Sequence, residues 1–215
     1  MKAVLRVILV LLVIWTGVIA WASANEKPYD FIKVSPADIA NCDESDGGPK
    51  PELVPLKDSE GLMNLSLLTT AKANASSLIP GYPRRHRIQN LNDGLYNNGA
   101  SWIPAGMPAW AEIDLGNEYI VQKVVFGSEH SAFWTDRAAT KFRILVAKHY
   151  SPDSKAPCWK EVYSYDNISS AISNTTEFIF PPQRCRYVRV EIEKSVAGDV
   201  RIDELEIYGK RPFLF

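Results

Sequence analysis

The chain has 215 residues and a formal net charge of -1, with 24 Lys and Arg against 25 Asp and Glu. This length accommodates one sizeable domain with flanking segments. The charge balance argues against nucleic acid as a partner, because nucleic-acid binding needs a basic excess or a basic stripe.

The N-terminal segment has the three parts of a secretory signal peptide. Lys2 and Arg6 precede an apolar run, and Ala22-Ser23-Ala24 forms a small-x-small cleavage site. We expect residues 1–24 to be the signal, and the remainder to be secreted, periplasmic or displayed on the cell surface. The alternative is an uncleaved membrane anchor, because the run approaches the roughly 20 residues that span a bilayer.

Residues 25–61 have the composition of a flexible linker. The stretch "NCDESDGGPKPELVPLKDSEG" is rich in proline, glycine and acids and shows no hydrophobic period. Such a composition does not bury enough apolar surface to order itself. The sequence therefore predicts that the folded domain occupies residues 62–211.

The rest of the chain reads as short strands separated by turn residues. In "RYVRVEIEK", Val188, Val190 and Ile192 alternate with polar residues, including Arg189. Alternation over four to eight residues indicates a half-buried strand. The same pattern recurs in "AWAEIDLG", "IVQKVVFG", "KFRILVA", "TEFIFPP" and "ELEIYG". The linkers between these strands are expected to include Gly116, Gly127, Pro152, Pro181, Pro182 and Gly198. Without a persuasive amphipathic helix, this predicts an all-β antiparallel sandwich or barrel.

Three cysteines raise the question of a disulfide. In an oxidising compartment Cys158 and Cys185 could bridge two strands, and the alternative is that both are free thiols. Cys42 is left over in the linker, as a free or intermolecular thiol.

Six fragments together resemble the discoidin domain, also called the coagulation factor V/VIII type C domain. They come in the family's order and at roughly its spacing: "LLTTAKANASSL", "NLNDGLYNNGASW", "AWAEIDLG", "CWKEV", "RYVRVEI" and "IDELEIYG". The resemblance covers about residues 63–210 and implies a jelly-roll β-sandwich of about eight strands. It also implies ligand-binding loops at one end, as in the carbohydrate-binding modules of bacterial secreted proteins.

The resemblance implies a structural calcium ion at the loop "NLNDGLYNNGASW". The Asp93 and Glu204 side chains would be the charged ligands, joined by carbonyl oxygens, and Ser101 could supply the hydroxyl because Ala100 stands where relatives carry serine or threonine. The candidate ligands are Asn90, Asp93, Leu95, Ala100, Ser101, Asp203 and Glu204. Calcium favours several oxygen ligands, and Gly94 would permit the backbone angles that such a loop needs. The alternative is a metal-free turn in which asparagine side chains bond to their own backbone.

The stretch Phe126–Phe142 carries the candidate ligand site. A sugar site needs a stacking aromatic with a few fixed polar groups beside it. The candidate residues are Glu129, His130, Phe133, Trp134 and Arg137. The alternative is that Trp134 only covers the end of the sandwich and that Asp136 and Arg137 form a surface ion pair.

Further residues have an expected place but no certain role. Arg84, Arg85 and His86 could lie on the same rim as the candidate ligand site. Three tryptophans are expected to be in the core: Trp102, Trp110 and Trp159.

Three classes of function remain after the motifs are considered. The sequence has no H-E-x-x-H, G-x-S-x-G or Walker motif, so we do not expect an enzyme. The leading hypothesis is an exported module that binds glycans or cell-surface glycoconjugates. The alternatives are binding to a phospholipid membrane surface and binding to an envelope protein as an adhesion domain.

Overall fold

The computed structural model describes residues 27–34, 50–82, 85–97, 100–131, 133–149, 158–172 and 174–212. The chain divides into two compact units, Met1–Asp30 and Phe31–Phe215. The expected signal peptide and Cys42 lie outside the described residues, and residues 27–30 have no regular secondary structure. Among the helices of the described residues, none has the length and apolar character to cross a membrane.

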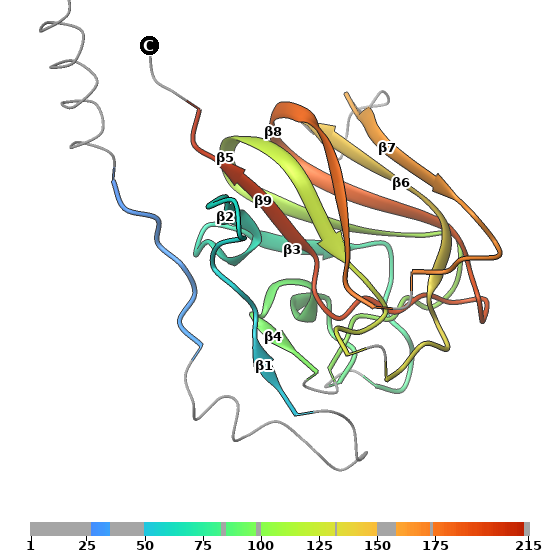
Figure 1. Ribbon diagram of the computed structural model, residues 1–215. Coiled ribbons are helices and arrows are strands. Elements are labelled where there is room, and N and C mark those ends of the chain that lie inside the picture. The colour runs from blue at the N-terminus through green and yellow to red at the C-terminus, as the bar shows by residue number, and fades with distance from the viewer. Residues whose placement is uncertain are drawn as a thin grey trace, which may run out of the picture. The chain divides into compact units, whose positions relative to one another are not determined.

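The second unit is built from β-strands (Figure 1). The strands are β1 Glu52–Leu53, β2 Met63–Asn64, β3 Lys72–Ala75, β4 Leu95–Tyr96, β5 Ala109–Phe126, β6 Ala139–Ala147, β7 Lys160–Asp166, β8 Thr176–Ser195 and β9 Glu206–Lys210. Two 3-10 helices, η1 Leu65–Leu67 and η2 Ile88–Asn92, lie between them. The main sheet has the order β2-β9-β5-β8-β6-β7 with β3 also on β5, and β1 pairs with β4. Every strand pairing is antiparallel.

β5 and β8 are long, curved strands that serve both layers of the sandwich (Figure 1). The first part of β5 pairs with β3 and with the end of β8, whereas its second part pairs with β9 and with the start of β8. A register shift after Asp114 separates the two parts, and Gly116 lies in this shift with a φ of 78°. Such irregularities bend a strand, and glycine adopts positive φ without steric strain.

The prediction of separate short strands was therefore wrong at two places. "AWAEIDLG" and "IVQKVVFG" are one strand, and so are "TEFIFPP" and "RYVRVEIEK". Pro181 and Pro182 lie at a second register shift, between the paired residues Ile179 and Gln183. Proline has no N–H to donate to a ladder, so a bulge tolerates it where a regular strand does not.

The two layers enclose an apolar core, which confirms the predicted jelly-roll sandwich. Val188, Val190 and Ile192 are at most 1% exposed, as the alternation predicted. Phe142 of β6 packs against Phe126 of β5 and Phe178 of β8, with ring centroids 5.0 and 5.1 Å away. These rings come from the two parts of the sheet that β5 and β8 connect, so they join the layers.

The outer face of the β3-β5-β8-β6-β7 layer holds an unexpected buried ion pair. Arg189 donates through Nε and Nη2 to Glu112 Oε2, at 3.0 and 2.7 Å, and both residues are buried. The Arg189 guanidinium lies 4.2 Å from the Trp110 ring centroid and 4.4 Å from that of Trp159. Trp102 is in the core as predicted, but Trp110 and Trp159 are half-buried on this outer face. Along β5, the inward positions next to Trp110 are Ala109 and Ala111, which are fully buried.

Part of the predicted linker belongs to the folded unit. Val54 is 5% exposed and forms a cluster with Leu67 and Tyr96, against which Phe31 and Ile32 pack. The Val54 amide donates to the carbonyl of Gly94, at 3.0 Å. The linker prediction is wrong for residues 31–34 and 50–61 because composition does not reveal that a polar segment lies against an existing core.

Asp58, within this segment, forms an ion pair whose removal should be measurable. Lys123 is 3% exposed, and its Nζ lies 2.6 Å from Asp58 Oδ2. Glu177, the other carboxylate beside Lys123, is mostly exposed. Asp58→Ala should lower the free energy of unfolding by about 2 kcal/mol, because a buried ammonium loses its buried partner.

Urea unfolding of Asp58→Ala and Asp58→Asn checks this expectation. The asparagine variant keeps an acceptor for the amides of Glu60 and Leu62 but loses the charge, so it separates capping from ion pairing. The exposed Glu60→Ala serves as the matched control and should stay within about 0.5 kcal/mol of the native protein. Equal stability of Asp58→Ala and Glu60→Ala would contradict the packing of this segment.

The disulfide alternative does not hold in the structure. Cys158 is an exposed free thiol and Cys185 is a buried one. Cys158 lies just before β7, Cys185 lies in β8, and β6 runs between these two strands. Strands two apart are separated by roughly 9–10 Å, which exceeds the Cα distance that a disulfide spans.

Candidate functional site

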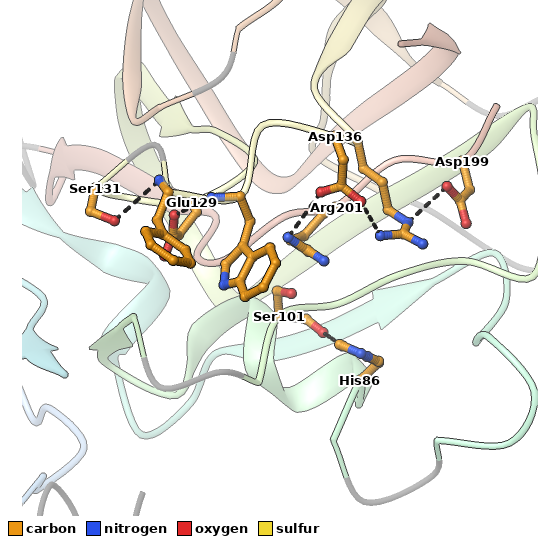
Figure 2. Close-up of polar contacts among 10 residues, drawn as sticks. His86, Ser101, Glu129, Ser131, Asp136, Asp199 and Arg201 are labelled. Carbon is orange, nitrogen blue, oxygen red and sulfur yellow. Dashed lines mark hydrogen bonds and ion pairs between the residues drawn. The ribbon is translucent and has the colours of Figure 1, made fainter. Parts of the chain in front are cut away.

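Loops from three parts of the chain meet at one end of the sandwich (Figure 2). Trp102 and Ile202 exchange backbone hydrogen bonds of 2.8 and 3.0 Å, and the Arg201 amide donates to the Arg137 carbonyl. The Val196 amide donates to the carbonyl of Ala138. The loop between β5 and β6 is thereby fixed against the segments around Trp102 and Arg201.

Two aromatic side chains stand out from this end. Phe133 is 54% exposed and Trp134 is 37% exposed, and their rings meet edge to face with centroids 4.9 Å apart. Aromatic rings that stay exposed in a loop add little to the stability of the fold. Exposed aromatic pairs of this kind are typical of a contact surface. The Trp134 amide donates to Glu129 Oε2 at 2.8 Å, which holds the loop below the indole.

A chain of alternating charges lies beside the aromatics (Figure 2). The Arg201 guanidinium lies 5.5 Å from the Trp134 ring centroid and donates through Nη1 to Asp136, at 3.3 Å. Asp136 also contacts Arg137, whose Nε donates to Asp199 at 2.9 Å. These four side chains hold one another in place, so each presents a fixed donor or acceptor.

His86 lies on the opposite side of Arg201 from these acids. Its Nδ1 donates to the Ser101 carbonyl at 2.8 Å, and its ring meets Tyr82, which is 53% exposed, edge to face. Burial lowers the pKa of His86, and the neighbouring Arg201 lowers it further. The imidazole is therefore neutral at pH 7, with Nε2 as a hydrogen-bond acceptor.

The candidate ligand residues named from sequence separate into two groups. Phe133, Trp134 and Arg137 share the surface described above. Glu129 is 4% exposed and supports the loop from beneath. His130 stacks on Tyr96 with ring centroids 4.0 Å apart, and its Nδ1 lies 3.0 Å from Thr175 Oγ1. Glu129 and His130 therefore make contacts that support the loop.

The loop around Asp93 meets the start of β9, as the predicted calcium site requires. The Gly94 amide donates to Glu204 Oε1 at 2.5 Å, although 110 residues separate the two. Gly94 has a φ of 84°, as the expected tight loop needs. Asp93 Oδ1 accepts a hydrogen bond from the Leu95 amide.

Burial and mutual repulsion raise the pKa values of two acids here. Asp203 Oδ2 accepts from the amides of Asn97 and His130, at 3.0 and 3.4 Å. Burial nevertheless raises the pKa of Asp203 to about 7, with a further contribution from Asp93. Burial and the nearby Asp93 carboxylate also raise the pKa of Glu204 well above its ordinary value. Buried like charges of this kind are stabilised by a bound cation.

Two buried oxygens test whether the residues fit a cation. Glu204 Oε2 and Asn90 Oδ1 are buried and have no hydrogen-bond partner. Among the described residues, no three His, Cys, Asp or Glu side chains converge closely enough to hold a metal by themselves. A cation here would therefore need amide and carbonyl oxygens in addition to the carboxylates, which is the mixture that calcium takes.

The remaining candidate ligands have mixed positions. Leu95 lies in β4, paired with Leu53 of β1. Ala100 is half-buried and Ser101 is 6% exposed, with the Ser101 carbonyl already accepting from His86.

A comparison with models of known protein families identifies the family of this chain. The model of the F5/8 type C domain matches residues 72–205, which is more than half of the sequence. This chain belongs to the F5/8 type C domain family. Among curated proteins, none matches the sequence significantly.

Solved structures similar to this chain include carbohydrate-binding modules. Chitosan-binding module 2 of a chitosanase/glucanase from Paenibacillus sp. IK-5, in complex with chitotriose, is 25% identical, with a TM-score of 0.54; the match covers 68% of this chain and 100% of that module. A module of Clostridium perfringens in complex with GalNAc-β-1,3-galactose is 16% identical, with a TM-score of 0.53, covering 65% and 96%. The family 32 module of C. perfringens NanJ, in complex with galactose, has the same identity and TM-score, covering 65% and 94%.

Sequence reasoning missed Arg201 and Asp199 of this F5/8 type C domain. Both lie in "GDVRIDEL", where Val200 and Ile202 are fully buried. The alternation of these two with polar residues is the signal of an extended segment with one buried face. Applied to this segment, it predicts that Asp199, Arg201 and Asp203 share the other face.

Proposed function

We propose that this F5/8 type C domain is an exported, non-catalytic module that binds carbohydrate at the surface of Phe133, Trp134, Asp136 and Arg201. The observation that carries the proposal is the exposed Phe133–Trp134 pair beside fixed charged groups. An exposed indole supplies a platform for the apolar face of a sugar ring, and fixed donors and acceptors select its hydroxyls.

The chemistry of the polar groups suits a neutral polyhydroxyl ligand. Arg201 can donate to a sugar oxygen, while Asp136 and the Nε2 atom of His86 can accept from hydroxyls. Each guanidinium already has a carboxylate partner, so binding a neutral sugar disturbs no ion pair. The galactose complex of a similar module supports this class of ligand.

A structural calcium ion completes the proposal. The side chains of Asp93 and Glu204 and the amide oxygen of Asn90 would hold it, with carbonyl oxygens of Leu95, Ala100, Ser101 or Asp203 filling the shell. The unpartnered Glu204 Oε2 and Asn90 Oδ1 support the choice of ligands. The ion would neutralise the buried carboxylates and stiffen the loop that leads to Ser101.

Membrane-surface binding is the second candidate function, favoured by the exposure of Phe133 and Trp134 at a loop tip. Attraction to an anionic membrane needs unpaired basic residues. Here Arg137 and Arg201 are paired with Asp136 and Asp199, which favours the sugar.

Replacing Trp134 tests the proposed function. Trp134→Ala should weaken glycan binding about tenfold, because the loss of a stacking platform removes about 1.4 kcal/mol of binding free energy. A glycan array identifies the ligand, and calorimetry then compares the variant with Ile179→Ala. Ile179 is 62% exposed on β8, so this control removes an exposed apolar side chain away from the proposed surface.

Two outcomes would contradict the proposal. Equal affinity of Trp134→Ala and Ile179→Ala for the glycan would show that the glycan does not bind at Trp134. Co-sedimentation with phosphatidylserine vesicles that is lost in Trp134→Ala, without any glycan binding, would favour the membrane surface.

A further inference from the structure

We propose that the outer face of the β5-β8-β6-β7 layer carries a second carbohydrate subsite, which binds further sugars of a neutral oligosaccharide held at the Trp134 surface. This inference rests on the proposed function of that surface and extends it from a terminal sugar to a chain.

A groove of about 480 Å³ lies on this layer, across four neighbouring strands. Trp110 of β5, Glu191 of β8, Arg143 of β6 and Ser164 of β7 line it, and these residues are successive partners across the sheet. The volume falls within the range of small-molecule sites. A groove that crosses strands in this way offers one side chain per strand to a linear ligand.

The Trp110 side chain gives the groove its aromatic platform. The ring is half-buried, and the Arg189 guanidinium packs over it at 4.2 Å. Because Glu112 in turn holds Arg189, the indole is fixed before any ligand arrives. A preorganised aromatic binds a sugar face with little loss of side-chain entropy.

The charged side chains in the groove form ion pairs with one another. Arg143 Nη2 donates to Glu191 at 2.7 Å, and Lys141 Nζ lies 3.1 Å from Glu193 and 3.4 Å from Asp166. A charged ligand would have to break one of these pairs. A neutral sugar can instead accept hydrogen bonds from Lys141 or Arg143 and donate its hydroxyls to the carboxylates. The ion pairs hold these carboxylates in fixed orientations and leave some of their lone pairs free to accept.

A chain of contacts along β8 links the groove to the Trp134 surface. Glu193 lies two residues before Ser195, whose Oγ donates to the Asp199 carbonyl at 2.6 Å. Asp199 accepts from Arg137 of the Trp134 surface (Figure 2). Two residues of strand span about 7 Å, so Glu193 at the edge of the groove lies close to the Ser195–Asp199 contact, and we expect a hexasaccharide to be long enough to contact both subsites.

Oligosaccharides of different lengths distinguish binding at the two subsites in solution. The probes are the neutral N-acetylated forms of chitobiose and chitohexaose, together with the corresponding galactose disaccharide and hexasaccharide. Binding is followed by the tryptophan indole N–H signals in ¹H–¹⁵N spectra. The disaccharides should shift the Trp134 signal alone, and one hexasaccharide should shift the Trp110 signal as well. Its affinity should exceed that of the disaccharide at least about tenfold.

Ser164→Phe blocks the groove without removing an ion pair. It should reduce the affinity for the hexasaccharide to that for the disaccharide, and leave the affinity for the disaccharide unchanged. Ile179→Phe, at an exposed position of β8, is the matched control. This variant should still bind the hexasaccharide more tightly than the disaccharide, by the same factor as the native protein.

Each outcome bears on one of the two sites. A Trp134 shift with no Trp110 shift, at any chain length, overturns the second subsite and leaves the proposed function intact. A Trp110 shift alone supports the groove and contradicts binding at Trp134. No shift of either signal overturns both for these sugars.

Discussion

Arg189→Ala is expected to lower the free energy of unfolding by about 3–5 kcal/mol, because it leaves a buried carboxylate without a counter-ion. Glu112 is 2% exposed, and Arg189 donates to its Oε2 through two nitrogens. The change also removes the cation between Trp110 and Trp159. Urea unfolding followed by tryptophan fluorescence measures the loss.

Two variants separate the buried charge from other causes. Arg143→Ala removes an arginine that is 56% exposed on the same face and should cost less than about 1 kcal/mol. The double variant Arg189→Met, Glu112→Leu removes both charges and should recover much of the stability lost by Arg189→Ala. A double variant as unstable as Arg189→Ala would show that packing, and not the unpaired carboxylate, dominates.

Removing the proposed calcium ion is expected to lower the melting temperature by about 5–10 °C. A ligand present at about 100 times its dissociation constant stabilises the native state by about 2.7 kcal/mol, which corresponds to this shift in a chain of this size. Differential scanning calorimetry with calcium and with a chelator measures it. Burial raises the pKa of Asp203 to about 7, and a nearby cation favours the ionised form of this carboxyl group. The stabilisation by calcium should therefore shrink as the pH falls below that value.

Glu204→Gln distinguishes a calcium ligand from a structural acid. With calcium, the variant should melt well below the native protein, because the amide is a poorer ligand. With chelator, it should be at least as stable, because its oxygen still accepts from Gly94 and the buried Glu204 carboxyl group is gone. Glu60→Gln, an exposed control, should keep the calcium response. A native melting curve that is the same with calcium and chelator would remove the metal from the account.

The fold could be predicted from sequence where one strand face is buried. The alternation of Val188, Val190 and Ile192 gave the correct inward face. The merging of strands across Gly116 and Pro181 could not be predicted, because bulges let both residues remain within a strand. The packing of Val54 and Asp58 depends on partners distant in sequence, Tyr96 and Lys123, which local composition does not show.

The candidate site was predictable in its chemistry and less so in its geometry. The loop that carries Phe133 and Trp134 was proposed from sequence because aromatic and charged residues are concentrated in it. Glu129 and His130 look equivalent to their neighbours in sequence, yet they turn inward to support the loop. Arg201 comes from a segment more than 60 residues away, and only tertiary contacts bring it to Trp134.

A crystal structure with the glycan selected by the array tests the central claim most directly. We predict a sugar ring stacked on the Trp134 indole, with its hydroxyls in hydrogen-bond contact with Arg201 and Asp136. Sugar density at another face, with no sugar at Trp134, would contradict the account.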